Sequence, residues 1–182
     1  MVWIVVAVVV ALLAVFAVAT YNRFVRGRNR VENAWAQVEV QLKRRWDLIP
    51  NLVDTVKGYA AHEQQTLQAV TDARAGAQRA STPQETAAAE GVLGQALGRL
   101  FAVAEAYPDL KADANFRQLQ TELSETENRI AVSRQIYNDA TLTYNNSIQV
   151  FPAVLLAGPF GFTAKEYLET EAAQREAPDV SF

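Results

Sequence analysis

The sequence predicts an all-α protein: one N-terminal transmembrane helix continues into an antiparallel bundle of long helices of the four-helix type, followed by a short C-terminal helix. Three observations predict this class. Residues 2–20 form an uncharged and almost wholly apolar run. Later stretches repeat apolar residues at steps of three and four, the helical spacing. No stretch alternates apolar and polar residues between hairpin turns, as antiparallel strands would.

The uncharged run has the length of a membrane-spanning helix. Its residues rise ~1.5 Å each and nearly match a hydrocarbon layer of ~30 Å, and the run has no polar face. A cleavable signal peptide is the alternative, because Ala17-Val18-Ala19 resembles a cleavage site. No basic residue precedes the run, however, and it exceeds the usual ~7–15 apolar residues of a signal peptide. We therefore expect a retained anchor over residues 1–22.

The charges are distributed unevenly around the net value of −3. Residues 1–22 carry none, residues 23–45 carry seven basic and two acidic groups, and residues 46–182 carry ten basic and eighteen acidic groups. The positive-inside rule therefore predicts a single-pass protein with its N-terminus outside and its body in the cytoplasm. We expect the following residues to lie at the membrane interface, where anionic headgroups attract cations: Tyr21, Arg23, Arg26, Arg28 and Arg30.

Four helices are expected in the body, residues 23–150. The first runs over residues 21–45 with the stripe Val31, Trp35, Val38 and Leu42, and only Gly27 could separate it from the anchor. The second is capped by Asp47, carries Pro50 in its first turn, and ends near Arg79. Its apolar side consists of Ile49, Leu52, Val56, Tyr59, Leu67 and Val70.

The third helix begins at Thr82-Pro83-Gln84-Glu85, which combines a capping box with proline at the first helical position. It carries Leu93, Leu97, Leu100 and Ala104 and ends at Tyr107-Pro108. Its interior glycines Gly91, Gly94 and Gly98 predict that a neighbouring helix approaches closely, which would offset their unfavourable helix propensity.

The fourth helix, residues 116–151, has the clearest pattern, a coiled-coil seam of alternating steps of three and four. The seam positions are Phe116, Leu119, Leu123, Thr126, Ile130, Ser133, Tyr137, Ala140, Tyr144, Ser147 and Phe151. In an up-down bundle whose first helix leaves the membrane, the fourth returns toward it. The end of this helix is therefore expected near the bilayer.

Residues 151–162 contain no charged and no polar side chain. They are too few, and too rich in proline and glycine, to span a bilayer. The segment could cover the end of the bundle, enter the membrane interface, or mediate self-association. Its candidate contact residues for a membrane or a second subunit are Phe151, Val154, Leu155, Leu156, Phe160 and Phe162. A second capping box, residues 163–166, is expected to start a short acidic helix that ends before Pro178 and completes a C-terminal region of residues 151–182.

Composition excludes several chemistries. The chain has no cysteine and one histidine, so thiolate metal sites, disulfides and paired-imidazole sites cannot form. His62-Glu63 resembles a phospho-accepting pair, but no nucleotide-binding loop follows it, so we interpret His62 as a surface residue of a bundle helix. Glu122, Glu125 and Glu127 lack an accompanying histidine and are interpreted as a solvated acidic face. We predict no enzyme, cofactor, metal or small-molecule substrate, and the acidic body argues against nucleic acid as a partner.

The cations Lys43, Arg44 and Arg45 lie about 20 residues beyond the anchor, ~30 Å from the bilayer, where screening removes most lipid attraction. They are expected to stabilise the C-terminus of the first helix. Docking of a protein partner is the alternative.

Several motifs together resemble the LemA family. They include Arg28-Asn29-Arg30-Val31, Asn33-Ala34-Trp35, the run from Val40 to Arg45, the run from Asp47 to Val53, Val56-Lys57-Gly58-Tyr59-Ala60, Tyr107-Pro108, Asn115-Phe116, the run from Glu127 to Ala131, Tyr137-Asn138, Tyr144-Asn145 and Phe151-Pro152. Trp46 departs from the pattern, which has a less bulky residue there.

The resemblance implies a bacterial single-pass inner-membrane protein with a helical-bundle body. It implies no catalytic residue and no enzymatic activity, and relatives include a magnetosome-formation protein. We therefore expect a membrane-anchored scaffold that self-associates or docks a membrane protein. A signalling or regulatory helical protein, for example a cofactor of membrane-protein quality control, is the alternative, and an enzyme is a weaker one.

Overall fold

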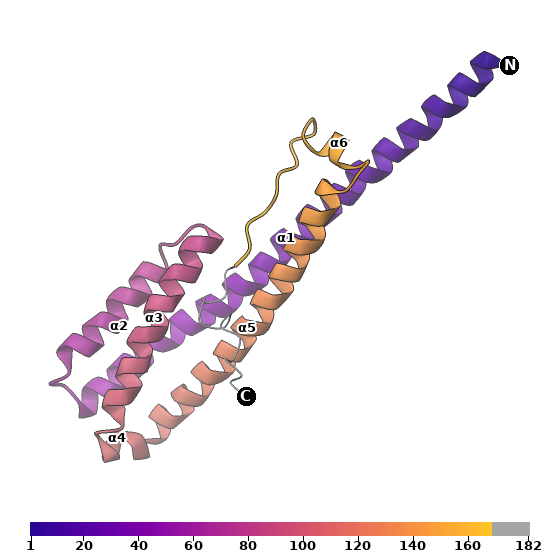
Figure 1. The fold of residues 1–182 in the computed structure, drawn as a ribbon. Helices are drawn as coiled ribbons and strands as arrows, with labels where there is room; N and C mark the ends of the chain where they lie inside the picture. Colours follow the sequence, from indigo (N-terminus) through magenta and orange to yellow (C-terminus); the bar gives the residue numbers. More distant parts are fainter. Residues whose placement is uncertain (169–182) are drawn as a thin grey trace, which may run out of the picture. The chain divides into compact units, whose positions relative to one another are not determined.

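A computed structural model describes residues 1–168, and these residues are almost entirely helical, with no strand among them. The helices are α1 (Val2–Tyr59), α2 (Gln64–Ala77), α3 (Pro83–Ala104), α4 (Pro108–Ala112), α5 (Ala114–Gln149) and α6 (Val154–Ala157), as Figure 1 shows. The predicted all-α class is confirmed. The chain divides into two compact units. The first comprises residues 1–37 and 135–166, and the second comprises residues 38–134 with Tyr167 and Leu168.

The first unit pairs α1 with the last part of α5, and the two run antiparallel. Trp35 packs edge-on against Tyr137, with ring centroids 5.4 Å apart. Nearer the N-terminus, the backbone of Gly27 lies so close to Tyr144 that a Cβ would approach its ring to 3.1 Å. Tyr144 is 1% exposed. Gly27 therefore does not break the helix but allows the two helices to approach closely.

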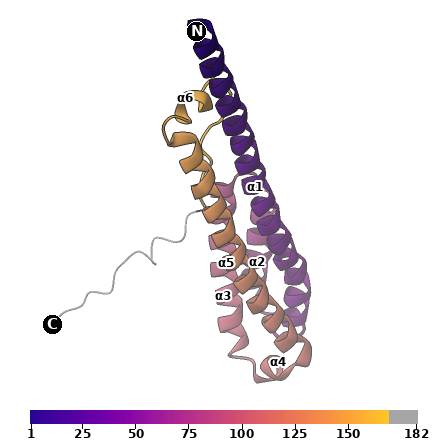
Figure 2. The ribbon, with the colours of Figure 1, turned by 90° about the vertical axis from the view of Figure 1, so that its right-hand side faces the viewer.

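The apolar N-terminal stretch of α1 projects beyond the end of α5 (Figures 1 and 2). None of its most apolar window of 18 residues is buried. Within residues 1–168, α1 is the one helix that is long and apolar enough to cross a membrane. The predicted anchor thus corresponds to an uncovered helical segment, as a lipid-facing helix requires.

The second unit packs the rest of α1, α2, α3, α4 and the first part of α5 around one apolar core. Figure 2 shows these helices from the side. The largest fully buried apolar side chains of this core are Ile49, Leu52, Val56, Val70, Leu93, Leu100 and Leu110. The start of α3 is the predicted one, because Glu85 N–H donates to Thr82 Oγ1 over 3.2 Å and Thr82 N–H donates to Glu85 Oε2 over 3.3 Å.

The first body helix does not end near Arg45, and Asp47 does not cap a second one. Both predictions are wrong, because α1 continues to Tyr59 with Pro50 inside it. Proline removes the N–H that would bond to the carbonyl of Trp46. That carbonyl instead accepts a hydrogen bond from Arg74 Nε over 2.7 Å. The chain turns only at residues 60–63, so His62 lies in an exposed turn and not on a helix.

The predicted seam of α5 is confirmed over most of its length. Ten of its positions, from Phe116 to Ser147, are buried or partly buried. The exception is Phe151, which is 79% exposed and lies beyond the end of α5. The expected close approach along α3 is not observed at Gly98, because a Cβ there would meet nothing within 4 Å.

The helix predicted to start at Thr163 is wrong for the residues described. Residues 162–168 have no helical structure. Asn145 binds this segment at Lys165, because its Oδ1 accepts from the Lys165 N–H over 2.8 Å and its Nδ2 donates to the Lys165 carbonyl over 2.9 Å. Tyr137 donates its hydroxyl to the Glu166 carbonyl over 2.8 Å. These main-chain bonds hold the segment along α5. The remainder of the predicted helix, residues 169–182, lies outside the described residues.

Candidate functional site

Residues 151–162 fold back onto α1 at the end of its apolar stretch. Phe160 packs edge-on against Tyr21 with centroids 5.3 Å apart, and Phe162 lies 5.5 Å from Tyr21 and 5.1 Å from Phe24. Arg28 places its guanidinium 5.6 Å from the Phe162 ring, within cation–π range. The segment is therefore fixed beside the residues that directly follow the uncharged run.

A helix-ending turn gives this segment its shape. After α6 the Gly161 N–H donates to the Gly158 carbonyl over 3.0 Å, and the Phe162 N–H donates to the Ala157 carbonyl over 2.9 Å. This pair of bonds is the Schellman pattern. It requires a positive φ at its penultimate residue, and Gly161 has φ of +73°. The turn directs Phe162 toward α1.

The six predicted contact residues of this segment divide into two groups. Phe162 is buried at 6% exposure, together with Ala153 and Ala157, and Leu156 is partly buried. Phe162 is buried against Tyr21 and Phe24 of α1. The remaining four point outward, with exposed fractions of 79% for Phe151, 65% for Leu155, 53% for Phe160 and 42% for Val154. We call these four residues the apolar ledge.

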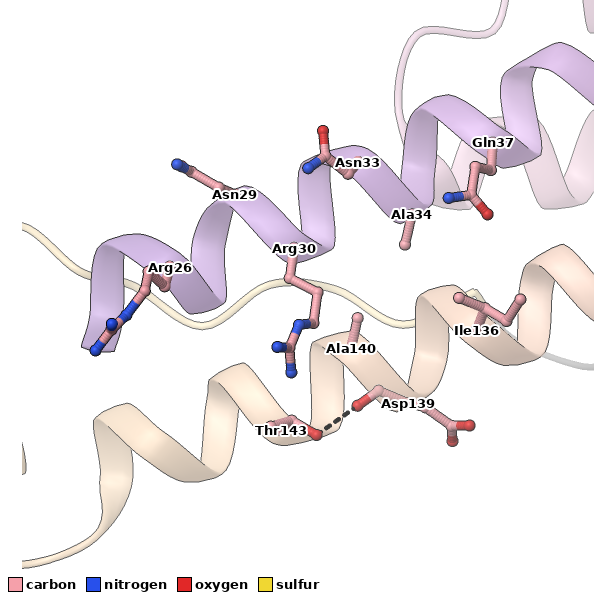
Figure 3. A pocket seen from close by; sticks show the side chains of 10 residues that line it. All are labelled: Arg26, Asn29, Arg30, Asn33, Ala34, Gln37, Ile136, Asp139, Ala140 and Thr143. Atoms are coloured by element: carbon pink, nitrogen blue, oxygen red, sulfur yellow. Dashed lines mark hydrogen bonds between the residues drawn. The ribbon is translucent and has the colours of Figure 1, made fainter. Parts of the chain in front are cut away.

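Two of the predicted interface arginines line a groove between α1 and α5 (Figure 3). The groove has a volume of about 630 Å³ and is lined by Arg26, Asn29, Arg30, Asn33, Ala34, Gln37, Ile136, Asp139, Ala140 and Thr143. In Figure 3, Arg30 extends from α1 toward Ala140 and Thr143. Two guanidinium groups and several amides form a lining that suits an anionic group, while Asp139 places a negative charge on the α5 side.

The other predicted interface residues lie on the same part of α1. Tyr21 contacts the two phenylalanines, and Arg23 is exposed. Arg28, besides its contact with Phe162, lies 3.9 Å from the carboxylate of Glu32 in an exposed ion pair. The first unit therefore has aromatic and cationic side chains together just beyond its apolar stretch. That combination is typical of a membrane–water boundary.

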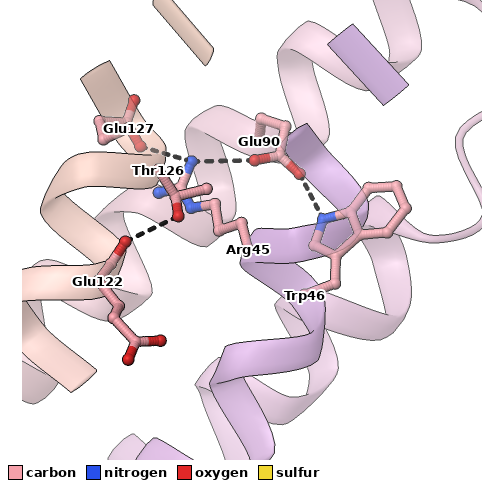
Figure 4. Close-up of polar contacts among 6 residues, drawn as sticks. All are labelled: Arg45, Trp46, Glu90, Glu122, Thr126 and Glu127. Atoms are coloured by element: carbon pink, nitrogen blue, oxygen red, sulfur yellow. Dashed lines mark hydrogen bonds and ion pairs between the residues drawn. The ribbon is translucent and has the colours of Figure 1, made fainter. Parts of the chain in front are cut away.

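The second unit contains a buried charge cluster, shown in Figure 4. Arg45 Nη1 lies 3.0 Å from Glu90 Oε2 and 2.9 Å from Glu127 Oε2. Trp46 Nε1 donates to the second oxygen of Glu90 over 2.7 Å. Arg45 and Glu90 are each 8% exposed, so both charges are removed from water. One carboxylate of α3 thus joins two successive residues of α1.

Burial raises the pKa of the Glu90 carboxyl above its ordinary value. Desolvation is the largest cause, and it outweighs the opposing attraction of Arg45 and the hydrogen bond from Trp46. The charge of Glu127 raises the pKa further. Since both Glu90 oxygens already accept bonds from inside the unit, this arrangement suits a structural tie more than proton transfer.

The three cations considered for partner docking do not share one surface. Arg45 is buried in the charge cluster. Arg44 is exposed, and Lys43 is exposed and lies 3.3 Å from Asp47 one turn further along α1. None of the three lies at a helix end, so the predicted role at the C-terminus of the first helix is wrong. Docking through Lys43 and Arg44 stays a prediction.

Sequence reasoning missed Glu90. Its signal was present, because Thr86 and Glu90 extend the stripe of Leu93, Leu97 and Leu100 backward at the same alternating spacing. The bulky Trp46 is also explained by Glu90, which accepts its indole N–H. Glu127, interpreted from sequence as a solvated residue, is half exposed but pairs with Arg45. Within residues 1–168, no group of three or more histidine or acidic side chains could hold a metal ion.

Comparison with known proteins gives the family of the chain. The model of the LemA family matches residues 34–182. Magnetosome protein MamQ 2 of Paramagnetospirillum magneticum is 32% identical over 196 aligned residues, covering 91% of this chain and 72% of that protein. Magnetosome protein MamQ of Magnetospirillum gryphiswaldense is 28% identical, covering 84% and 66%. Protein LemA of Metamycoplasma hominis is 29% identical, covering 71% and 60%. On these matches, and with its helical fold, the chain belongs to the LemA family.

Proposed function

We propose that this protein is a membrane-anchored helical scaffold of the bacterial inner membrane that self-associates or docks another membrane protein. The observation that carries the proposal is α1. Its first 18 or so residues are apolar and uncovered, while its later turns contribute to both compact units. One helix therefore contains both a segment suited to lipid and residues of the core of the body.

Two further observations support a structural role. The charged side chains that are buried within residues 1–168, Arg45 and Glu90, bond to one another, and Glu90 also accepts from Trp46, so they are not available to a substrate. Two of the relatives are named as magnetosome proteins, which supports a part in building a cellular structure.

Cross-linking in native membranes tests the scaffold proposal. The chain has no cysteine, so single cysteines can be placed on exposed positions of the body, for example Val132→Cys and Ser124→Cys. We expect bifunctional maleimide reagents to yield discrete adducts, with a second copy or with a defined membrane protein. Recovery of monomer alone from both positions, under conditions that cross-link a known membrane dimer, would contradict the proposal.

The orientation is also a proposal, with the N-terminus outside and the body in the cytoplasm. It is supported by Arg23, Arg26, Arg28 and Arg30, which follow the apolar stretch directly, because cationic flanks remain on the cytoplasmic side. The Ser124→Cys variant should resist an impermeant maleimide in intact cells and react after permeabilisation. Equal labelling in both conditions would reverse the orientation.

Signal transmission is a second candidate, and the unbroken course of α1 from Val2 to Tyr59 favours it. A continuous helix can transmit a rotation of its membrane segment to its later turns. Insertion of one alanine after Thr20 rotates the following residues by ~100° about the helix axis. A signalling role predicts that this insertion changes the cross-linking pattern at Val132→Cys. Under a purely structural anchor the pattern stays the same.

A further inference from the structure

We propose that the apolar ledge, Phe151, Val154, Leu155 and Phe160, inserts into the interfacial layer of the same bilayer that holds the N-terminal stretch of α1. The protein would then contact the membrane at two points. This inference rests on the proposed membrane anchoring and names the lipid bilayer as the partner of residues 151–162.

Residues 151–162 contact α1 at the point where its uncharged run ends. The uncharged run ends at Thr20, and Tyr21 is the next residue. Phe160 packs on Tyr21, so the tip of the segment lies at the level where the hydrocarbon layer ends. Phe162 packs on Tyr21 and Phe24, and Arg28 packs on Phe162. Aromatic rings flanked by arginine are favourable at this depth, where they contact both lipid and water.

The side chains of residues 151–162 divide into a buried group and an exposed group. The inner residues Ala153, Ala157 and Phe162 are already buried inside the unit, at exposed fractions of 5% or 6%. Phe151, Val154 and Leu155 remain exposed, and Phe160 is still 53% exposed although it packs on Tyr21. Residues 151–162 hold no polar or charged side chain that would keep such a surface in water. Large exposed apolar patches indicate a contact with a membrane or a protein.

Lipid fits this surface better than a second copy does. Stable protein interfaces bury ~800 Å² on each partner, which is more than four partly exposed side chains provide. The ledge also lies beside the apolar surface of α1, so a bilayer that accepts the stretch before Tyr21 reaches the ledge without a further partner. Short apolar segments that lie in the interface plane bind membranes in this manner.

Depth-dependent fluorescence tests the inference on the full chain in vesicles of phosphatidylcholine and phosphatidylglycerol. An environment-sensitive fluorophore, NBD, is attached to single cysteines at Leu155→Cys and, independently, Phe151→Cys. Val8→Cys in the uncharged run is the positive control. Ile136→Cys is the matched negative control, because Ile136 is 44% exposed and lies on α5 at the end of the groove that is farther from the apolar stretch, some 20 Å beyond it.

We expect blue-shifted emission at Leu155→Cys and Phe151→Cys, with quenching by nitroxide-labelled lipid at least threefold stronger than at Ile136→Cys. Quenching at both ledge sites equal to that at Ile136→Cys would overturn the inference. A blue shift that disappears when the lipid-to-protein ratio rises tenfold would assign the ledge to a second copy and also overturn it. If Val8→Cys itself is not quenched, the membrane anchoring fails. If Val8→Cys is quenched and the ledge is not, only the present inference fails.

Discussion

Arg74 donates a hydrogen bond from its Nε to the main-chain carbonyl of Trp46 over 2.7 Å, and this is the carbonyl that Pro50 leaves without its helical donor. A proline inside a helix usually costs ~3 kcal/mol or more, partly through the lost N–H. Here a side chain of α2 replaces that N–H. The bond from Arg74 explains how α1 remains continuous through Pro50. It also fixes α2 against α1 at Trp46.

The first prediction concerns this bond. The Arg74→Met variant keeps an apolar stem but removes the donor, so the Trp46 carbonyl is left without a partner. We expect the free energy of unfolding to fall by about 1–3 kcal/mol. In a Pro50→Ala background the same change should cost much less, because the new N–H of residue 50 can bond to Trp46. Denaturant unfolding in detergent micelles, followed by circular dichroism, measures both.

Arg79→Met is a matched control, because Arg79 lies in the turn after α2 and its guanidinium makes an exposed hydrogen bond to the Ala75 carbonyl. It should change stability by less than ~0.5 kcal/mol. An equal loss from Arg74→Met with and without Pro50 would refute the compensation.

The continuity of α1 beyond Arg45 was predictable from the spacing of its apolar residues, but Pro50 suggested a break in the helix. Val38, Leu42, Arg45, Ile49, Leu52 and Val56 continue one pattern of alternating steps with no change of phase. A helix that restarts at Asp47 has no reason to preserve that phase. The sequence predicts a helix start at Asp47, because proline is tolerated in the first turn of a helix. No local signal revealed that an arginine 24 residues after Pro50 would supply the missing hydrogen bond.

The stripes also indicate which parts of the charge cluster could be foreseen. Arg45 and Glu90 each occupy a seam position otherwise held by apolar residues, so their burial follows from periodicity. Their pairing does not, because it depends on the register between α1 and α3. The hydrogen bonds between Asn145 and Lys165 were likewise not predictable, since a side-chain amide that binds a main-chain segment leaves no periodic pattern in the sequence. The apolar segment 151–162 was recognisable from composition, but the division between its inner residues and the ledge required the fold.

The second prediction tests the buried pair. Arg45→Met leaves Glu90 buried with only part of its compensation, and we expect a loss of about 3–5 kcal/mol in the free energy of unfolding. The double variant Arg45→Met with Glu90→Met should recover most of this loss, since two packed apolar side chains replace two desolvated charges. Arg44→Met is the neighbouring exposed control and should be nearly neutral. A double variant less stable than either single variant would contradict the argument.

The third prediction is a pH dependence that originates at Glu90. Its carboxyl has a raised pKa in the folded protein, so the folded state retains a proton that the unfolded state loses near the ordinary value of 4.5. Stability contributed by the protonated form is therefore lost as the pH rises from about that value through the folded pKa, and it is constant above. Glu90→Gln does not titrate. As the pH rises through this interval, we expect wild type to lose unfolding free energy that the Glu90→Gln variant does not lose. The stability of the variant relative to wild type should therefore increase. Parallel curves from pH 4 to pH 8 would refute the assignment.

The fourth prediction concerns the segment after Phe162. Asn145→Ala removes both bonds to Lys165, while Asn146→Ala alters an exposed neighbour. Since each hydrogen bond contributes ~0.5–1.5 kcal/mol, amide exchange of Lys165 should accelerate about fivefold or more in the first variant. Exchange in Asn146→Ala should match wild type. Hydrogen–deuterium exchange with mass spectrometry of peptides covering residues 160–168 measures the exchange rate in both variants. Equal rates in the two variants would show that Asn145 does not hold the segment.

The fifth prediction compares two glycines inside helices. At Gly98 a Cβ would meet nothing within 4 Å, so Gly98→Ala should stabilise the protein by about 0.5–1 kcal/mol through helix propensity alone. At Gly27 a Cβ would lie 3.1 Å from the ring of Tyr144, which is fully buried and has little room to shift. Crowding of this kind costs ~1–3 kcal/mol and should outweigh the gain in propensity, so Gly27→Ala is expected to lower the melting temperature. Combining it with Tyr144→Ala, which removes the whole ring, should make alanine at position 27 favourable relative to glycine in the same background. A melting temperature that rises equally for both alanine variants would show that α1 and α5 can separate at Gly27 without loss.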